Sequence, residues 1–337
     1  MTSAPPRDVD AVLLEQEEDR GGPVRTLLGS QIAGPLAALV LAIVIFALTT
    51  STFLNADNLS LIATQSVVVG TLALGQTLII LTAGIDLSNG AIMVLAAVVI
   101  GKLATDGNPL LALAAGTAVC LVLGGLNGVL ISRFSLPPFI VTLGMLSVLS
   151  AVARLYTDSQ SYPIDSDLLT VLNRGPTIGG VTITYGVFLW IALTAVLGYA
   201  LTQTAWGTHV YAVGDNRAAA ALTGIKVKRV LLSVYLTAAV VYAFAAWQAL
   251  GRTPTADPSG YSTANLDSIT AVVIGGTSLF GGRGGVVGTF IGALIVTVLA
   301  NGLTQAGIDS LYQQVATGVL VVVAVAVDHF VRTRQTR

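Results

Sequence analysis

The sequence predicts an all-α, polytopic membrane protein with about ten transmembrane segments and with both termini in the cytoplasm. Three observations lead to this prediction. Of the 337 residues, 54% are hydrophobic and only 10% are charged, and the mean hydropathy is +0.83. Apolar segments recur along the chain at about the 20-residue length that crosses a bilayer core of ~30 Å. Lys and Arg are distributed unequally over the polar segments between them.

The composition also excludes other classes. A soluble domain carries about 25% charged residues, and a disordered chain needs low hydrophobicity. The net charge of −1 gives no indication of nucleic-acid binding. The single cysteine, Cys120, rules out a disulfide within the chain, and no Cys/His spacing typical of a metal site is present. His209 and His329 lie in polar segments, where we expect solvated side chains.

Residues 1–29 are polar and include an acidic run, so we expect a disordered cytoplasmic tail rather than a secretory signal. Apolar segments follow that are long enough to cross the membrane. These are 31–50, 64–84, 88–104, 108–131, 138–156, 181–202, 230–250, 284–304 and 311–327. A further run, 266–280, is short and contains Gly275 and Gly276, so it is either a short span or a re-entrant segment.

Charge distinguishes between nine and ten crossings. With the N-terminus inside and 266–280 counted as a crossing, twelve of the 16 Lys and Arg lie inside, whereas without this crossing the split is eight to eight. We therefore predict ten crossings within a transmembrane domain at 30–331, and a cytoplasmic tail at 332–337. The long polar loop 203–229 is then inside and 157–180 is outside.

Two glycine-containing stretches, 82–90 and 275–285, interrupt apolar runs. Broken helices are tolerated at membrane depth only where they are buried in protein or line a wet cavity. The alternative is local, because Asp86 or Ser88 could cap the following helix. One break lies in each half of the chain, which weakly suggests an internal repeat.

Gly284, Gly288 and Gly292 recur every four residues, and Gly124 and Gly128 form a similar pair. On a helix such glycines share one face and permit close backbone approach. This pattern fits helix packing within the chain and an interface between subunits equally well.

Polar residues in or beside the spans are candidates for a translocation path, the alternative being hydrogen bonds between helices. They are Gln65, Gln76, Asp86, Asn89, Asn127 and Asn301. We expect no Asp, Glu, Lys or His near the middle of any span. An ionisable residue there usually indicates function, so its absence argues against a proton-driven transporter and an intramembrane protease.

The phosphate-binding pattern G-x-x-x-x-G-K-[ST] is absent, so ATP-driven work would need another chain. Within loop 203–229, Asn216 can cap the start of an alanine-rich helix and Gly224 can end it. A short helix on the cytoplasmic face would suit mechanical contact with a soluble partner. The alternative is a solvated loop.

This loop, WGTHVYAVGDNRAAAALTGIKVKRV, resembles the cytoplasmic loop of permease subunits of ATP-binding-cassette importers for monosaccharides, the ribose/xylose/galactose branch. Similarity to the same family extends over about 30–331. It includes GQTLIILTAGIDLSNGAI (75–92), LNGVLISRFSLPPFIVTLGML (126–146), ITAVVIGGTSLFGGRGGVVGT (269–289) and the blocks at 53–66 and 301–328.

The resemblance implies a non-enzymatic permease in the bacterial inner membrane that pairs with a second permease copy. Two ATPase subunits would bind loop 203–229 and hold the ATP, so that this chain needs no cofactor. An extracytoplasmic binding protein would deliver the sugar. The residues that match the family's coupling pattern are Gly214, Asn216, Ala219, Ala220 and Gly224.

One departure concerns the charges around this pattern, because family members often carry an acidic residue before the Ala-Ala pair and a basic one after it. Here Arg217 and Ala218 precede the pair and Ala221 follows it, so we expect contact with the ATPase mostly by packing. The lack of charge within the spans fits a neutral solute such as a sugar. The alternative function is an ATP-independent secondary transporter or facilitator of a small neutral solute.

Overall fold

The structure, a computed structural model, describes residues 32–105, 107–309 and 311–316 together with positions 318, 319, 322 and 326. Six of its helices are long and apolar enough to cross a membrane. They are α4 (Ala56–Leu81), α6 (Pro109–Arg133), α7 (Pro138–Thr157), α9 (Tyr185–Gln203), α12 (Val227–Arg252) and α14 (Val286–Gln305). Three shorter apolar helices are α3 (Ala33–Thr49), α5 (Asn89–Ala104) and α13 (Ala264–Ile274).

These nine helices correspond to nine of the ten predicted spans, which confirms the all-α polytopic class. Part of the tenth, 311–327, and both predicted tails lie outside the described residues. The number of crossings and the side of each terminus remain predictions.

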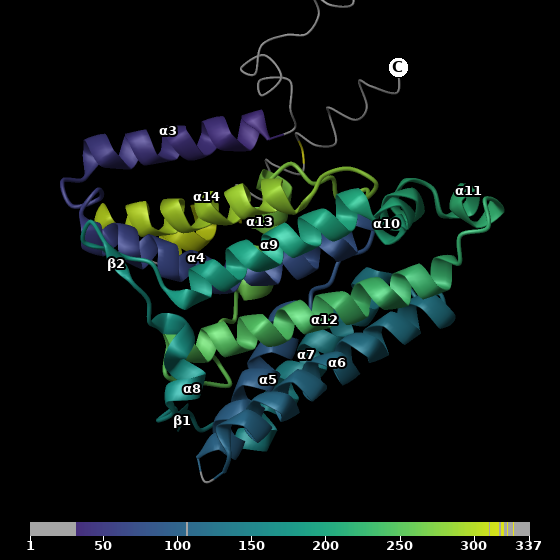
Figure 1. The fold of residues 1–337 in the computed structure, drawn as a ribbon, viewed down its shortest axis with the longest axis horizontal. Coiled ribbons are helices and arrows are strands. Elements are labelled where there is room, and N and C mark those ends of the chain that lie inside the picture. Colours follow the sequence, from purple (N-terminus) through teal and green to yellow (C-terminus); the bar gives the residue numbers. More distant parts are fainter. Residues whose placement is uncertain are drawn as a thin grey trace, which may run out of the picture.

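The long helices run side by side along one axis, so the bundle has two distinct ends (Figure 1). One end, which we call the strand end, carries two antiparallel pairs of short strands. These are β1 (Tyr162–Pro163) with β4 (Thr255–Ala256) and β2 (Thr177–Ile178) with β3 (Val181–Thr182). The short helices α8 (Asp167–Thr170) and η1 (Val171–Asn173) also lie there. The opposite end, which we call the α11 end, carries α10 (Ala205–Asp215) and α11 (Arg217–Leu222).

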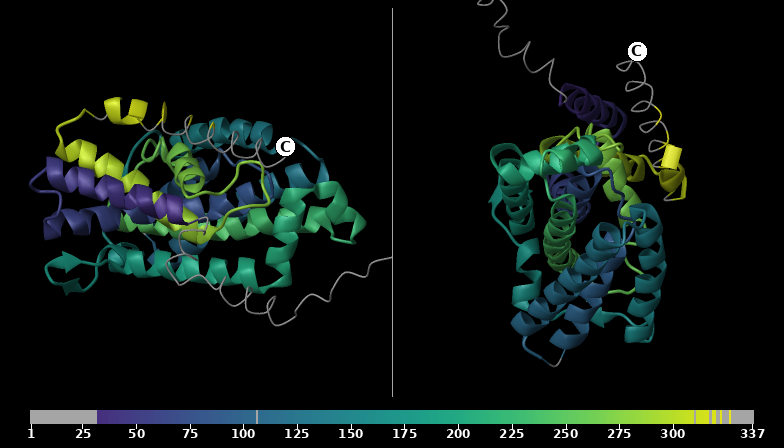
Figure 2. Two further views of the ribbon diagram at one scale, coloured as in Figure 1. Left: turned by 90° about the horizontal axis from the view of Figure 1, so that it is seen from above. Right: turned by 90° about the vertical axis from the view of Figure 1, so that its right-hand side faces the viewer.

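Helices α4 and α12, each 26 residues long, pack against each other, α12 also against α5 and α6, and α4 also against α9, α13 and α14; further views of this bundle are given in Figure 2. Small residues allow this close packing. A Cβ built at Gly75 of α4 would lie 2.5 Å from the Tyr242 ring of α12, and one at Gly124 of α6 would lie 2.5 Å from Ala239 of α12. Gly124 and Gly128 therefore serve helix packing within the chain.

The outer faces of the peripheral helices expose large apolar side chains. Examples are Leu110 and Val122 on α6, Ile140 on α7 and Val196 on α9. In a soluble protein these residues would favour burial. Their exposure on long apolar helices fits contact with lipid, as the composition predicts.

Two of the connections do not stay at the ends of the bundle. Segment 82–88 leaves α4 and returns into the interior, because the backbone of Asp86 lies beside Gln76, five residues before the end of α4. Segment 253–263 leaves α12 and leads to α13, whose Asn265 donates to the Leu87 carbonyl (3.2 Å). The shorter helices α5 and α13 therefore both begin inside the bundle.

Candidate coupling and translocation site

The helix predicted in loop 203–229 is present as α11, between the predicted caps. The Asn216 side chain accepts hydrogen bonds from the backbone N–H groups of Ala218 and Ala219, both at 3.0 Å. Gly224 ends the helix with φ of +88°, a conformation that glycine adopts without strain. Asn216 thus caps the start of the helix, Ala219 lies within it, and Gly224 ends it.

One side of α11 faces the protein and the rest faces away from it. Ala220 is buried, whereas Ala219 is exposed and Leu222 is 90% exposed. The Leu222 side chain therefore lies open on a six-residue helix beyond the end of the bundle.

Gly214, at the end of α10, joins this loop to both predicted helix breaks. A Cβ at Gly214 would lie 1.8 Å from the Leu81 carbonyl oxygen and 2.7 Å from the Gly282 nitrogen. The Gly282 N–H in turn donates to Leu81 O (3.0 Å). We call the contact among Leu81, Gly214 and Gly282 the glycine junction. It lies at the α11 end and brings together three segments that are far apart in the sequence.

Two side chains reinforce the junction. The Tyr211 hydroxyl donates to the Gly284 carbonyl (2.8 Å), and burial raises the pKa of this phenol, which stays protonated at neutral pH. The Arg217 guanidinium donates to the Thr82 carbonyl (2.9 Å). Arg217, which departs from the family pattern, therefore connects α11 to the first helix break.

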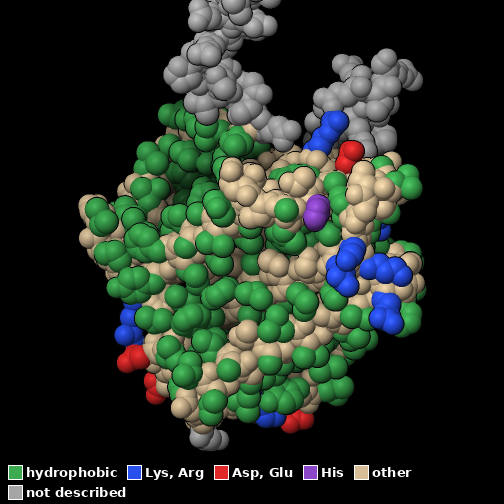
Figure 3. All heavy atoms as spheres, turned by 45° about the vertical axis from the view of Figure 1, so that its right-hand side comes forward, with side chains coloured by type: hydrophobic (Ala, Val, Ile, Leu, Met, Phe, Trp, Pro, Cys, Tyr) green, Lys and Arg blue, Asp and Glu red, His purple; other side chains and the backbone are tan. Residues whose placement is uncertain are grey.

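Basic residues gather at the α11 end, on the surface beside α11 and the start of α12 (Figure 3). The exposed members in this part of the chain are Arg217, Lys226, Lys228 and Arg229. The flank of the bundle in the same view is mainly hydrophobic. This separation is the one expected of a membrane protein whose basic end faces the cytoplasm.

Further inside the bundle, segment 82–88 carries a buried carboxylate. Asp86 Oδ1 accepts from Ser88 N (2.8 Å) and from Ser88 Oγ (2.6 Å), and Asp86 Oδ2 accepts from Tyr242 Oη (3.3 Å). Asn127 Nδ2 of α6 donates to Ser88 Oγ (2.9 Å). When the Gln76 side-chain amide is oriented so that both its nitrogen and its oxygen have partners, it donates to Asp86 O (3.0 Å) and accepts from Asp86 N (3.2 Å).

A second set of hydrogen bonds extends this network to α13. Asn89 Nδ2 donates to Ser268 Oγ (2.8 Å), and Ser268 Oγ donates to the Asn265 carbonyl (2.8 Å). We call the connected side chains the polar cluster. Its members are Gln76, Asp86, Ser88, Asn89, Asn127, Tyr242, Asn265 and Ser268.

The expectation concerned the middle of the spans, and Asp86 lies between two of them, in segment 82–88, but the fold carries this acid inside the bundle. Asp86 is 1% exposed and contacts Tyr242, which lies fifteen residues from the start of the 26-residue α12. The sequence places Asp86 between two apolar runs, where a polar residue normally marks a loop at the surface. The fold instead turns segment 82–88 inward, and the carboxylate is compensated by hydrogen bonds, as a buried charge requires. The Asp86–Ser88 bond also serves the local role of fixing the start of α5.

Four of the six candidate path residues, Gln76, Asp86, Asn89 and Asn127, lie together in the polar cluster. Gln65 lies half-buried on α4, about three turns from Gln76. Asn301 lies at the strand end, where it and Asn58 exchange hydrogen bonds of 2.9 and 3.0 Å. That pair joins α4 to α14 and is separate from the cluster.

The glycines at 284–292 pack within the chain. A Cβ at Gly288 would lie 2.1 Å from the Gly275 carbonyl oxygen, and one at Gly292 would lie 2.0 Å from that of Ala271. Both therefore let α14 pack against α13. Gly284 does not share their helical face, since α14 begins at Val286 and Gly284 has φ of +115°.

Sequence reasoning did not find Ser88, Tyr242, Asn265 and Ser268 as members of the cluster, nor Tyr211 at the junction. Serine and tyrosine in apolar helices carry no distinctive local pattern. The one available signal was the density of polar residues in 86–89, which indicates that partners must exist.

Among the described residues, no group of three or more His, Cys, Asp or Glu could bind a metal ion. The arrangement instead links an exposed helix, a backbone junction and a buried set of amides and hydroxyls. Such a set can exchange hydrogen bonds with a passing polar solute or with itself.

Comparisons with known proteins show the family of the chain. A family profile described as the permease component of the branched-chain amino acid transport system matches residues 58–325. The fructose import permease FrcC of Rhizobium meliloti is 42% identical, covering 91% of this chain and 87% of that protein.

More distant relatives include two further sugar permeases. The ribose import permease RbsC of Bacillus subtilis is 38% identical over 88% of this chain and 92% of its own length. The D-allose transport system permease AlsC of Escherichia coli K12 is 33% identical over 88% and 91%. No solved structure matches the chain. The chain belongs to this family of integral inner-membrane permease components of ABC importers.

Proposed function

We propose that the chain is the membrane permease subunit of an ATP-driven importer for a monosaccharide. Identity of 33–42% to the fructose, ribose and allose permeases, over about nine-tenths of the chain, is the observation that carries the proposal. The family description names branched-chain amino acids. The sugar permeases are the better guide because the similarity to them extends over whole proteins.

The α11 end is proposed to face the cytoplasm and to bind two ATPase subunits, one for each of two permease copies. The exposed Leu222 and the neighbouring basic residues support this orientation. The strand end then faces the extracytoplasmic side, where a binding protein delivers the sugar. Nucleotide is bound by the ATPases and this chain carries out no covalent chemistry.

Coupling would pass from α11 through the glycine junction. ATP binding draws the ATPases together and moves α11, and Gly214 transmits this movement to the ends of α4 and segment 275–285 by backbone contact. Arg217 transmits it to Thr82, at the start of the segment that carries Asp86. The polar cluster is thereby moved relative to α12. ATP and the loaded binding protein bias the two states only through their different affinities for them.

Reconstitution in proteoliposomes with the cognate ATPase and binding protein tests the proposal. We expect uptake of D-fructose, D-ribose or D-allose that requires ATP and both partners, and no comparable uptake of L-leucine. Uptake of L-leucine and of none of the three sugars would contradict the assignment to a sugar.

The second candidate is a gradient-driven transporter. The buried Asp86 favours it, because intramembrane carboxylates often take part in proton transfer. In that case the purified chain alone would move sugar down an imposed gradient, and uptake would not depend on ATP.

The ATPase contact has its own test. Leu222→Asp places a charge on an exposed position, so the fold should persist while co-purification of the ATPase is lost. Ala221→Ser, also exposed on this helix but outside the coupling pattern, is the matched control with little change in size. Normal ATPase binding by the Leu222→Asp protein would show that α11 is not the contact surface.

A further inference from the structure

A cavity of about 360 Å³ opens at the strand end, within the range of small-molecule sites. Three parts of the chain line it: the second and third turns of α5, the last turn of α12, and segment 253–263. The α5 and α12 walls are mainly apolar and include Met93, Val94 and Leu250. We call this cavity the strand-end pocket.

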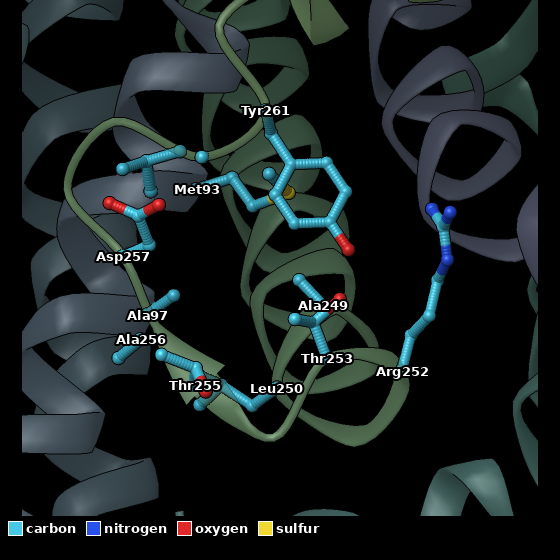
Figure 4. A pocket seen from close by; sticks show the side chains of 12 residues that line it. Met93, Ala97, Ala249, Leu250, Arg252, Thr253, Thr255, Ala256, Asp257 and Tyr261 are labelled. Atoms are coloured by element: carbon cyan, nitrogen blue, oxygen red, sulfur yellow. The ribbon is translucent and has the colours of Figure 1, made fainter. Parts of the chain in front are cut away.

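The polar groups of the strand-end pocket come from the chain that follows α12. Figure 4 shows the Tyr261 ring projecting into the middle of the pocket, with Asp257 on one side and Arg252 on the other. Thr253 and Thr255 add hydroxyl groups. Among the described residues no ion pair joins Arg252 to Asp257, so both charges are available to a bound molecule.

Two of these side chains are held in position. Asp257 Oδ1 accepts from Ser259 N (2.8 Å), which fixes its carboxylate and leaves Oδ2 available. Tyr261 has φ of +54°, an uncommon conformation for a residue other than glycine. Its hydroxyl is buried and has no hydrogen-bond partner among the described residues. A buried hydroxyl without a partner is unfavourable, so a bound ligand that supplies a partner is favoured.

The strand-end pocket lies next to the polar cluster. Met93 is one helical turn from Asn89, a member of the cluster. A smaller cavity of about 80 Å³ shares Val94, Gly260 and Tyr261 with the pocket and reaches Gly90 and Asn265. Tyr261 therefore lines both the pocket and a smaller space that reaches Asn265 of the cluster.

We infer that the strand-end pocket is a binding site for a monosaccharide within the permease itself, with Tyr261 as the platform for the sugar ring. An aromatic face packs against the C–H groups of a sugar, while carboxylate, guanidinium and hydroxyl groups pair with its hydroxyls. The mixture of apolar walls with a few fixed polar groups is typical of a small-molecule site. The inference rests on the proposed function and adds where the sugar is received before it passes inward.

The occupancy test uses labelling of a single thiol. Cys120 is the only native cysteine and is buried, so Thr253→Cys introduces one exposed thiol at the pocket. In the complete transporter, we expect saturating D-fructose or D-ribose to slow labelling by a membrane-impermeant maleimide at least about threefold. Ser159→Cys, exposed at the same end but outside the pocket, is the control and should label equally with and without sugar.

A second measurement is transport. Tyr261→Ala should lower ATP-driven uptake at low concentrations of sugar-loaded binding protein about tenfold, as loss of a central aromatic contact does. Tyr261→Phe, which retains the ring, should lower it about threefold, as expected for one hydrogen bond. The exposed Tyr185 at the start of α9 gives the matched control, Tyr185→Ala.

The outcomes distinguish two failures. If the wild-type transporter takes up none of the sugars tested, the proposed function fails. If it takes up sugar, but sugar does not slow labelling of Thr253→Cys and Tyr261→Ala transports normally, only the pocket assignment fails. Protection by L-leucine in place of sugar would overturn the assignment to a monosaccharide.

Discussion

Segments 82–88 and 253–263 enter the bundle from opposite ends and meet inside it. Each follows a 26-residue helix, α4 or α12, and each leads to a shorter helix, α5 or α13. They come together where Asn265, in the first turn of the α13 helix that follows the second segment, donates to the Leu87 carbonyl. The two segments differ in whether the protein itself supplies hydrogen-bond partners for their polar groups.

The carboxylate of segment 82–88 is satisfied by the protein, through Ser88 and Tyr242. Segment 253–263 is mostly exposed, lines a cavity and leaves the Tyr261 hydroxyl without a partner. This difference fits the two roles proposed above, in which the first segment transmits movement from the glycine junction and the second receives a molecule. Each of the following predictions tests one side of this contrast.

The largest effect is expected at Gly214. Gly214→Ala places a methyl group where a Cβ would lie 1.8 Å from Leu81 O, so the backbone of the junction must separate. Overpacking of this kind costs about 1–3 kcal/mol or more, and we expect uptake to fall more than about tenfold. Gly144→Ala on α7, where no atom lies within 4 Å, is the control. Normal ATP-driven uptake by the Gly214→Ala protein would show that the junction does not transmit movement.

The next effect concerns Asp86. Asp86→Ala leaves the Ser88 and Tyr242 donors unpaired in the interior, at about 1–3 kcal/mol for each group. Asp86→Asn keeps an oxygen acceptor and should lose much less stability. Thermal unfolding of the two purified proteins in detergent makes the comparison. Equal melting temperatures for both variants and the wild type would mean that the cluster contributes no stability.

Arg217 tests the connection between α11 and segment 82–88. Arg217→Gln weakens the bond to Thr82 O, and Lys228→Gln removes the same charge from an exposed site at the start of α12. A hydrogen bond from a charged group is worth about 1.5–3 kcal/mol when buried, and less at this exposed side chain. We expect a several-fold lower ratio of sugar transported to ATP hydrolysed for Arg217→Gln only. The same loss in both variants would indicate a general effect of charge on ATPase binding.

How much of the fold and of the candidate site could be predicted from the sequence depended on how far apart in the sequence the contacting residues lie. The caps of α11 were predictable because Asn216 and Gly224 act within a few residues. The depth of Asp86 was not, since it depends on Gln76, Asn127 and Tyr242 on three different helices. The strand-end pocket was also not predictable, because Tyr261 in a polar segment resembles any other loop residue.

The smallest effect separates strain from function. Ala83 and Tyr261, one in each segment, both have positive φ values, +57° and +54°. Glycine relieves a cost of about 1–2 kcal/mol at such positions but gains entropy in the unfolded chain. Ala83→Gly should therefore raise the free energy of unfolding by up to about 1 kcal/mol, measured by thermal or denaturant unfolding. Tyr261→Gly relieves the same strain but removes the proposed platform and its packing against the core, so it should lose sugar uptake and should not gain stability. If Tyr261→Gly instead retained full uptake, the strained tyrosine would have no role in receiving the sugar, and the contrast between the two segments would not stand.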